Sequence, residues 1–475
     1  MRLLYARCAA EISMVELRHY QSDILDKASH AYRHVRSVLI QAPTGSGKSQ
    51  MGAAAAARAL SKGRRVFWIT HRRELIKQVS RTLAQWEIDH GVVSAGFPAA
   101  YSREMQICSL DTLRRRFSNV GTPGLIIWDE ARHLAANTWK AVYKRYPFTA
   151  HLGLDATPQR NDGKGLADFF QEIVHGPTMR WLIDNGFLAD YKLYAPESPD
   201  LSGMHTLYGD YVKSELEATF DKPAIIGNAI EHYRRFAPES RALVFCVSIK
   251  ASQKTADAFR AAGIPALHAD GATATEIRDG ILDDFTRGAI RVLCSVNLFT
   301  EGLDIAGVDC VIQLRPTQSR ALYLQMIGRG LRPFPGKQRC LILDACSNWE
   351  RHGLPTDPYD WQLTYDEESR RTVRKPSVRI CAACFCALPS QTQSCPECGY
   401  EFPAKPREIL TKDGSLIELT PEEIARRAER RRSGFERAQA QTLEQLQEIE
   451  RRKGYRPGWA RHVFEARLAK QQAQS

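Results

Sequence analysis

Gln41-Ala42-Pro43-Thr44-Gly45-Ser46-Gly47-Lys48-Ser49 is the stretch of this sequence with the most specific pattern. It lies between an apolar run at 38–40 and an alanine-rich run at 51–60, an order that predicts a strand, a loop and a helix. Apart from Ala42 at its first position, it matches the phosphate-binding pattern G-x-x-x-x-G-K-[ST]. A Gly-Ser turn before a surface helix is the weaker alternative, because both flanking elements are present. We therefore predict a nucleotide site at Thr44, Gly45, Ser46, Gly47, Lys48 and Ser49.

Each residue type in this loop has a physical role in holding ATP. Gly45 and Gly47 allow backbone N–H groups to turn toward phosphate oxygens, where a Cβ atom would clash. Lys48 is expected to reach the β- and γ-phosphates, and the hydroxyl of Ser49 to hold Mg²⁺. Gln21, upstream in a helical pattern, is a candidate for adenine, because an amide can pair with N6 and N7 together. Taken alone, Gln21 could equally be an exposed helix residue.

A pair of carboxylates follows the apolar run at 125–128. Asp129 is expected to hold Mg²⁺, and Glu130 to orient the water that attacks the γ-phosphate. An Asp-Glu pair on the surface is the general alternative. It is less favoured here because the pair comes directly after a run typical of a buried strand.

Two other predicted strand ends carry hydroxyl and basic groups. Arg72 and Arg73 follow the run at 66–70, and Ser109 and Thr112 lie at the end of the next short run. These are the side chains that contact nucleic-acid phosphates, which position a backbone without reading its sequence. For each junction alone, a solvated basic helix start explains the pattern equally well.

The bulk properties limit the class of protein. A length of 475 residues suggests about three domains. The net charge of +12 favours an acidic polymer as partner, nucleic acid first, although charge alone also fits a soluble basic surface.

No apolar run is long enough to span a membrane, so we expect no membrane partner. Single cysteines scattered in apolar runs indicate a reducing compartment, and we expect a cytoplasmic protein. Residues 1–13 are predicted to be a disordered tail or an upstream start-site artefact.

A second alternating pattern begins after a boundary rich in Pro, Ser and Gly at 196–209. Predicted strands alternate with predicted helices, which argues for a parallel sheet covered on both faces. After the strands, Arg329 and Arg332 lie three residues apart beside Gly328 and Gly330, on what is predicted to be one helix face. Such arginines can stabilise a transferring phosphoryl group, whereas a plain basic helix face is the alternative.

Together these motifs resemble those of superfamily 2 helicases of the DEAD/DEAH-box-like, DNA type, over roughly residues 15–350. Residues 42–49 resemble motif I, 129–131 motif II, 156–158 motif III, 300–304 motif V and 325–332 motif VI. The resemblance implies an α/β fold of two RecA-like P-loop lobes, parallel sheets with helices on both faces, with ATP and Mg²⁺ in the cleft. With the boundary at 196–209, we expect the first lobe at 14–195 and the second at 210–365.

The same resemblance assigns roles to individual residues. It implies nucleotide contacts at Gly302 and Asp304, and catalytic roles for Glu130, Gln325, Arg329 and Arg332.

Two positions depart from the family pattern. Arg132 stands where many relatives have His, and Asp155 precedes Ala-Thr-Pro where the family usually has Ser or Thr. Both positions lie where the family couples hydrolysis to movement, so they bear on coupling more than on catalysis.

A cysteine cluster predicts a zinc ribbon at 378–404. Two short C-x-x-C turns can present four thiolates to one tetrahedral Zn²⁺: Cys381, Cys384, Cys395 and Cys398. A redox pair or unligated thiols are the alternatives, and Cys386 is a spare thiol. At 420–475 we expect a basic helical tail, whose aromatics and arginines could stack on bases, dock a protein, or pack on the lobes as a helix cap.

We expect an ATP-dependent DNA helicase or translocase, a nucleic-acid-stimulated ATP hydrolase. The preferred partner is single-stranded or forked DNA, in repair, recombination or replication. The cysteine cluster narrows the resemblance to RadD-type helicases of bacteria or phages, and the zinc ribbon or tail could bind proteins. The alternatives are an RNA helicase, a nucleotide-switched scaffold that binds nucleic acid, and the motor subunit of a restriction system. The last is ranked lower because no nuclease cluster is evident outside the motor.

Overall fold

The computed structural model describes most of the chain from Glu16 to Gln472. The segments outside the description are 1–15, 161–163, 196–203, 208–209, 221–222, 297, 300–304, 306, 366–377, 391, 403–439, 441 and 473–475. The predicted tail at 1–13 and the predicted contacts Gly302 and Asp304 therefore lie outside the described residues. The chain divides into two compact units, Met1–Pro403 and Ala404–Ser475.

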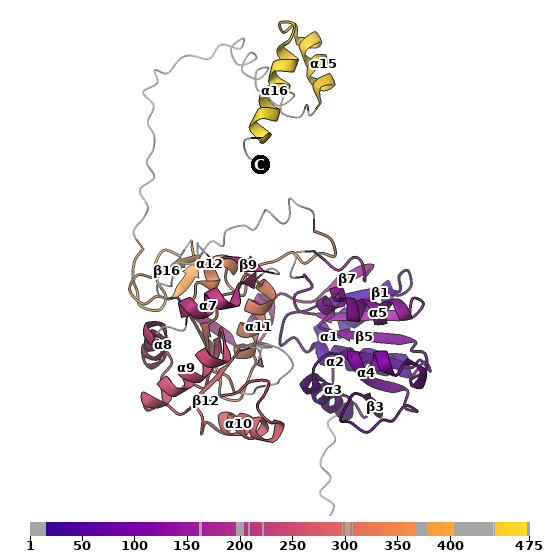
Figure 1. The fold of residues 1–475 in the computed structure, drawn as a ribbon, viewed down its shortest axis with the longest axis vertical. Coiled ribbons are helices and arrows are strands. Elements are labelled where there is room, and N and C mark those ends of the chain that lie inside the picture. The colour runs from indigo at the N-terminus through magenta and orange to yellow at the C-terminus, as the bar shows by residue number, and fades with distance from the viewer. Residues whose placement is uncertain are drawn as a thin grey trace, which may run out of the picture. The chain divides into compact units, whose positions relative to one another are not determined.

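The first lobe is a seven-stranded parallel sheet with the strand order β3-β4-β2-β5-β6-β1-β7. Its central strands are buried along their whole length, which explains their continuous apolar runs. Helices cover the sheet, as Figure 1 shows in its indigo and purple part. The strands are β1 (Ser37–Gln41), β2 (Val66–Thr70), β3 (His90–Val93), β4 (Met105–Ser109), β5 (Leu125–Asp129), β6 (Ala150–Asp155) and β7 (Glu172–His175). The helices are α1 (His19–Ala31), α2 (Lys48–Leu60), α3 (Arg73–Gln85), α4 (Leu110–Arg115), α5 (Asn137–Arg145) and α6 (Met179–Asp184).

The second lobe is a six-stranded parallel sheet with the order β12-β13-β11-β14-β15-β8. Its strands are β8 (Asp190–Tyr194), β11 (Ala242–Cys246), β12 (Ala266–His268), β13 (Val292–Ser295), β14 (Cys310–Leu314) and β15 (Arg339–Asp344). Its helices are α7 (Lys213–Phe220), α8 (Pro223–Phe236), α9 (Ile249–Ala261), α10 (Thr275–Arg287), α11 (Arg320–Gly330) and α12 (Asn348–His352). Two short strands, β9 (Thr206–Leu207) and β10 (Asp210–Tyr211), pair antiparallel. Two parallel-sheet lobes confirm the predicted fold class.

The boundary between the lobes lies earlier than the sequence indicated. β8 falls within the range 14–195 expected for the first lobe, but it pairs in parallel with β15 and so belongs to the second sheet. The reason is that an edge strand is assigned by its hydrogen-bonding partner. That partner lies about 150 residues further along the chain, where no local pattern reveals it.

The cysteine segment packs on the outer edge of the second sheet. Its own strands, β16 (Val378–Ile380) and β17 (Ala387–Pro389), pair antiparallel. Tyr194 forms a β-bridge with Cys386, the N–H of Ala195 donates to the carbonyl of Phe385 at 3.1 Å, and Lys192 pairs with Glu397. Since an open sheet edge exposes unpaired backbone groups, this segment serves as a cover for β8.

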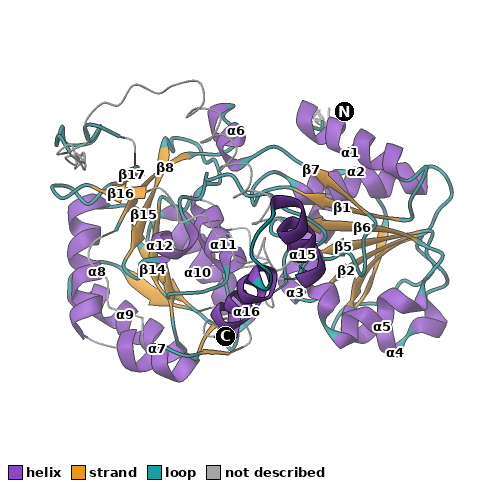
Figure 2. Ribbon diagram, turned by 90° about the horizontal axis from the view of Figure 1, so that it is seen from above, coloured by secondary structure: helices purple, strands orange, loops and turns teal. Residues whose placement is uncertain are grey.

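The second unit contains a helical hairpin of α15 (Leu443–Lys453) and α16 (Trp459–Gln472) (Figure 2). Its small core includes Leu446 and Ile449, with Tyr455 and Trp459 packed beside them at 4.5 Å between ring centroids. These aromatics are therefore used largely inside the hairpin itself. Among all the residues that the structure describes, no helix combines the length and apolar character needed to cross a membrane.

Candidate nucleotide site and nucleic-acid interface

The loop between β1 and α2 has the backbone conformation that its glycines predict. Gly45 has φ of +85° and Gly47 of +81°, a region that residues with a Cβ rarely adopt. A Cβ built on Gly47 would also lie 2.2 Å from Nε2 of Gln21. The loop thus depends on glycine for both its turn and its close contact with α1.

Lys48 begins α2 and folds back over its own loop. Its Nζ donates to the carbonyl oxygens of Ala42 and Pro43 at 3.1 and 3.2 Å. Burial lowers the pKa of the Lys48 ammonium, while the nearby carboxylates of Glu130, Asp155 and Asp129 favour its charged form. The structure thereby brings the predicted phosphate-binding lysine together with the predicted metal and water-orienting carboxylates.

Those carboxylates lie at the carboxyl ends of two neighbouring strands, β5 and β6, and Gln41 ends the next strand, β1. In the sheet register, Asp129 pairs with Leu154, and Asp155 pairs with Gln41. Burial, and next the neighbouring Glu130, raise the pKa of Asp129 to about 7. A bound cation would favour its ionised form, and carboxylate and hydroxyl oxygens are the ligands that Mg²⁺ prefers, so Asp129 and Ser49 fit this ion.

Glu130 has an unusual backbone conformation. Its φ is +53°, in the left-handed region that is uncommon for a residue other than glycine, and a 3₁₀ helix at Ala131–Ala135 begins directly after it. Such conformations are concentrated at functional sites, because a tight tertiary environment must maintain them.

The second lobe contacts the loop through α11. A Cβ on Gly328 would lie 2.7 Å from Cβ of Thr44, so the absence of a side chain lets this helix approach the phosphate loop. Gln325 and Arg329 are buried on the same helix, at 4% and 5% exposure.

The position of Arg332 corrects one expectation. α11 ends at Gly330, and Leu331 caps it, so Arg332 lies beyond the helix and does not share a helix face with Arg329. Pro333 explains this end, because the residue before a proline disfavours the helical conformation. Nζ of Lys337 donates to the carbonyls of Gly330 and Arg332 and holds this turn.

Gln21 supports the phosphate loop from α1. Its Nε2 donates to the carbonyl of Ser46 at 2.9 Å, and its Oε1 accepts the N–H of Arg18 at 3.0 Å. At 3% exposure it is not a surface glutamine, so that alternative is wrong. Contact with adenine remains a prediction.

Beside Gln21 lies an aromatic cluster that the sequence did not indicate. The ring of Tyr20 contacts the rings of Trp181 and Phe187 at centroid distances of 5.7 and 5.0 Å, and the Tyr20 hydroxyl donates to the Ser46 carbonyl. Trp181 and Phe187 come from α6 and the turn after it, far from α1 along the chain, so local patterns could not connect them.

The two strand ends that were predicted to contact phosphates, after β2 and after β4, lie side by side. β2 and β4 pair with Thr70 opposite Ser109, so the residues after both strands share one edge of the sheet. Oγ of Ser109 donates to Oγ1 of Thr112 at 2.9 Å. Nε of Arg72 lies 3.3 Å from Nε2 of His71, and the exposed Arg73 has its guanidinium 5.2 Å from the centroid of Phe97. All four candidates therefore lie at the carboxyl edge, with Phe97 as a neighbour that the sequence did not predict.

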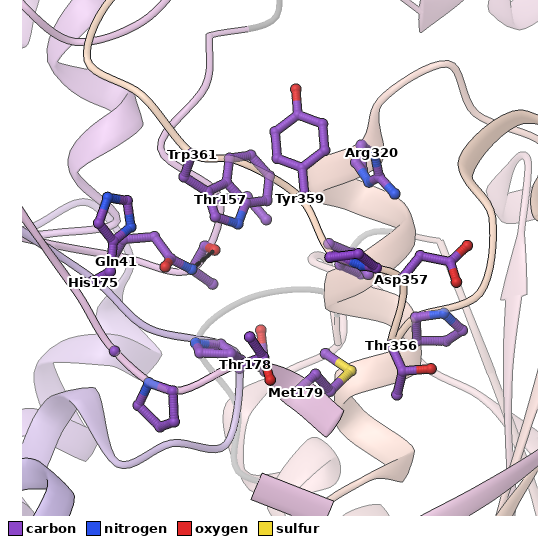
Figure 3. A pocket seen from close by; sticks show the side chains of 18 of the residues that line it. Gln41, Thr157, His175, Thr178, Met179, Arg320, Thr356, Asp357, Tyr359 and Trp361 are labelled. Carbon is purple, nitrogen blue, oxygen red and sulfur yellow. Dashed lines mark hydrogen bonds between the residues drawn. The ribbon is translucent and has the colours of Figure 1, made fainter. Parts of the chain in front are cut away.

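A cavity of about 270 Å³ lies where the two lobes meet. Figure 3 shows Gln41 and His175 of the first lobe across from Arg320 and Asp357 of the second. Asp357 belongs to residues 355–361, a segment that returns from the second lobe to the first and forms one part of the wall. Further parts of the wall come from residues 43–44, 156–157 and 176–179 of the first lobe.

That returning segment joins the lobes directly. The hydroxyl of Tyr359 donates to Oε1 of Gln159 at 3.3 Å, and the N–H of Ala167 donates to the carbonyl of Leu363 at 3.0 Å. The sequence offered no sign of it, because these pairs are about 200 residues apart.

The four predicted zinc ligands lie together. Their sulfur atoms are all within 4.8 Å of one another, with 3.6 Å between Cys381 and Cys398 and between Cys384 and Cys395. A tetrahedral site with Zn–S bonds of about 2.3 Å has sulfur–sulfur edges of roughly 3.8 Å, so the geometry fits zinc. Cys386 lies apart from this set, buried against β8.

Comparison with known proteins gives two family matches. Residues 14–160 match the model described as type III restriction enzyme, res subunit, and residues 221–333 match the helicase conserved C-terminal domain.

Relatives extend over most of the chain. A 51.5 kDa protein of a Lactococcus phage is 32% identical over 387 residues, which is 81% of this chain and 82% of that protein. A candidate mitochondrial ATP-dependent helicase, irc3 of Schizosaccharomyces pombe, is 31% identical over 74% of this chain. The chain spans only 61% of irc3.

Two solved structures share the fold. The first is a fragment of a candidate HsdR subunit of a type I restriction enzyme from Vibrio vulnificus, with a TM-score of 0.57 and 19% identity over 74% of this chain and 67% of that one. The second is the DNA-bound type ISP restriction-modification enzyme LlaBIII, with a TM-score of 0.54 and 19% identity over 70% of this chain and 28% of that one.

Proposed function

The chain belongs to the superfamily 2 helicases and is an ATP-hydrolysing enzyme, and from this premise we propose that it uses ATP hydrolysis to move along DNA. The single observation that carries the proposal is the approach of Gly328 to Thr44, which brings the motif with Gln325 and Arg329 to the phosphate loop. A site built from both lobes is sensitive to their relative movement, so a change in the nucleotide can change the cleft.

The proposed roles follow the chemistry of each side chain. Lys48 and the loop N–H groups hold the phosphates, and Asp129 with Ser49 holds Mg²⁺, which neutralises phosphate charge when bound. Glu130 orients the attacking water, and Arg329 and Arg332 stabilise the charge of the transferring group from the second lobe. Gly302 and Asp304, outside the described residues, are proposed nucleotide contacts on the strength of the motif alone.

DNA is the polymer along which we propose that the protein moves. Its phosphates would be contacted by Arg72, Arg73, Ser109 and Thr112. Their shared position at the edge of β2 and β4 supports this assignment. We place the activity in DNA repair, recombination or replication, with single-stranded or forked DNA as the preferred form. The four cysteines at zinc-site spacing favour a RadD-type member, in which the ribbon or the helical hairpin could also bind a protein.

The test measures ATP turnover of the full chain with single-stranded DNA, duplex DNA, forked DNA and RNA, beside a strand-displacement assay. We expect DNA to raise the rate, and Glu130→Gln to bind ATP without turning it over. Stimulation by RNA alone would identify an RNA helicase. Slow turnover that no nucleic acid changes would identify a nucleotide-switched scaffold.

A second candidate function is the motor of a restriction system. It is favoured by the match of residues 14–160 to a res subunit and by the likeness to two restriction-enzyme folds. Purification from its native host separates the two proposals. Co-purification with a methyltransferase and ATP-dependent DNA cleavage by the complex would favour the restriction motor.

A further inference from the structure

The two residues that depart from the helicase pattern contact each other. Nη1 of Arg132 donates to Oδ1 of Asp155 at 2.9 Å, and the backbone N–H of Arg132 donates to Oδ2 at 2.7 Å. The family's usual His and Ser or Thr at these positions are both replaced here. The replacements are of opposite charge, so one compensates the other.

This pair is buried. The side chain of Asp155 has no exposed surface, and that of Arg132 is 8% exposed. A buried carboxylate is costly unless it is paired and hydrogen-bonded, and Asp155 also accepts the N–H of Thr157 at 2.8 Å. Asp155 therefore has partners for both oxygen atoms, and its position is set by them.

Arg132 also contacts the proposed water-orienting residue. The same Nη1 that reaches Asp155 pairs with Oε2 of Glu130. Because one nitrogen contacts both carboxylates, the cation held at Asp155 limits where the carboxylate of Glu130 can lie. The chain Asp155–Arg132–Glu130 thus connects the end of β6 with the residue that follows β5.

We propose that Arg132 is a positioning residue that holds Glu130 in the orientation needed to act on water, and that Asp155 holds Arg132. This inference rests on the proposed function, because it presumes that Glu130 acts on water. The backbone N–H of Thr157 donates to Oδ1 of Asp155, the oxygen that also accepts from Nη1 of Arg132. Thr157 in turn lines the cavity between the lobes. A movement at the lobe interface can therefore reach Glu130 through this chain.

A purely structural ion pair would predict different behaviour. In that case the pair serves only to neutralise Asp155, and any variant that restores stability also restores turnover. If Arg132 positions Glu130, stability and turnover respond differently. A pair of neutral side chains at 132 and 155 can keep the fold stable, but it cannot hold the Glu130 carboxylate by charge.

The experiment compares Arg132→Gln, Asp155→Asn and the double variant with the wild-type full chain. Thermal unfolding, kcat and KM for ATP are measured for each. Arg132→Lys is the conservative rescue, and Arg58→Gln, which breaks the exposed pair with Asp26, is the matched control. Either single variant can be unstable, because it leaves a buried polar group without its partner.

We expect the double variant to unfold near the wild-type temperature while kcat stays lower by on the order of 10²-fold, the cost of misplacing a catalytic group. KM for ATP should change less than about twofold, and Arg132→Lys should recover most of kcat. A double variant that regains kcat together with stability would overturn the inference, as would an Arg132→Gln enzyme that turns over at or above the wild-type rate. Lack of ATP turnover in the wild-type protein itself would instead refute the proposed function.

Discussion

The junction of β1 with α2 in the first lobe and that of β11 with α9 in the second lobe differ in one respect that separates their functions. In the second lobe, β11 passes to α9 through Ser248, whose hydroxyl accepts the N–H of Ala251 at 3.1 Å. In the first lobe, β1 passes to α2 through a glycine loop, and the N-cap is Gly47, which has no side chain. A helix N-terminus has N–H groups in need of acceptors, so α9 meets this need internally, whereas α2 can offer them to phosphate. Two similar junctions therefore differ in what they can bind. The N-terminus of α2 is open to a phosphate group, whereas that of α9 is already capped by a side chain.

The largest expected effect tests the first junction. Lys48→Ala should reduce ATP hydrolysis to background, because no other cation of the loop reaches the phosphates. Ser248→Ala, at the matching place in the second lobe, should cost about 1 kcal/mol of stability and leave turnover intact. Steady-state ATPase assays and thermal unfolding of both variants would check this. Equal turnover in the two variants would contradict the contrast between the lobes.

The second effect tests what the second lobe contributes to the shared site. Arg329→Ala should lower kcat by on the order of 10³-fold while ATP affinity changes little, since the arginine acts on charge that develops in the transition state. Fluorescent-nucleotide binding and single-turnover assays separate these quantities. Arg287→Ala, an exposed arginine on α10, is the control. A parallel loss of affinity and rate in Arg329→Ala would point to ground-state binding instead.

The third effect concerns the outer edge of the second lobe. We expect one Zn²⁺ per chain, and Cys395→Ser should lose it, because a closed site needs all four thiolates. Since the ribbon covers β8, this variant should also expose a sheet edge and aggregate more readily, while basal ATPase persists.

Metal analysis and light scattering would measure both consequences. Cys386→Ser is the matched variant, and it should keep its zinc because Cys386 lies outside the four-sulfur set. Zinc-free protein prepared without chelators would refute the site.

The smallest effect compares the two ends of the strands in the first sheet, the carboxyl end after β2 and the amino end before β1. Arg72→Ala should weaken DNA binding for all sequences alike and reduce the log–log salt slope by roughly 0.7–0.9, the contribution of one phosphate contact. Arg33→Ala, just before β1 at the other end of the strands, should leave the slope unchanged. Fluorescence anisotropy at several salt concentrations measures both. A salt slope that changes only in Arg33→Ala would show that DNA binds at the amino end of the strands instead.

Local patterns predicted the parts of the site that lie within one strand–loop–helix unit. The loop at 42–49 and the pair at 129–130 follow buried parallel strands, and such strands have continuous apolar sequences that stand out. The two C-x-x-C turns could also be identified from local sequence, because each turn carries two of the four thiolates within four residues. The end of α11 differs from the prediction that Arg329 and Arg332 share one helix face, because Pro333 disfavours the helical conformation at Arg332.

What the sequence determined by itself was the residue types of each segment, and with them the predicted chemistry: a phosphate-binding loop, a carboxylate pair, a cysteine set and two alternating strand–helix domains. Only the tertiary structure decided which segments meet. It assigned β8 to the second sheet, placed the ribbon on that strand, brought residues 355–365 back to the first lobe, and paired Arg132 with Asp155. The physical reason is that propensity and periodicity act over a few residues, whereas these contacts join segments tens to hundreds of residues apart. Their energies depend on burial and partner geometry, which exist only in the folded chain.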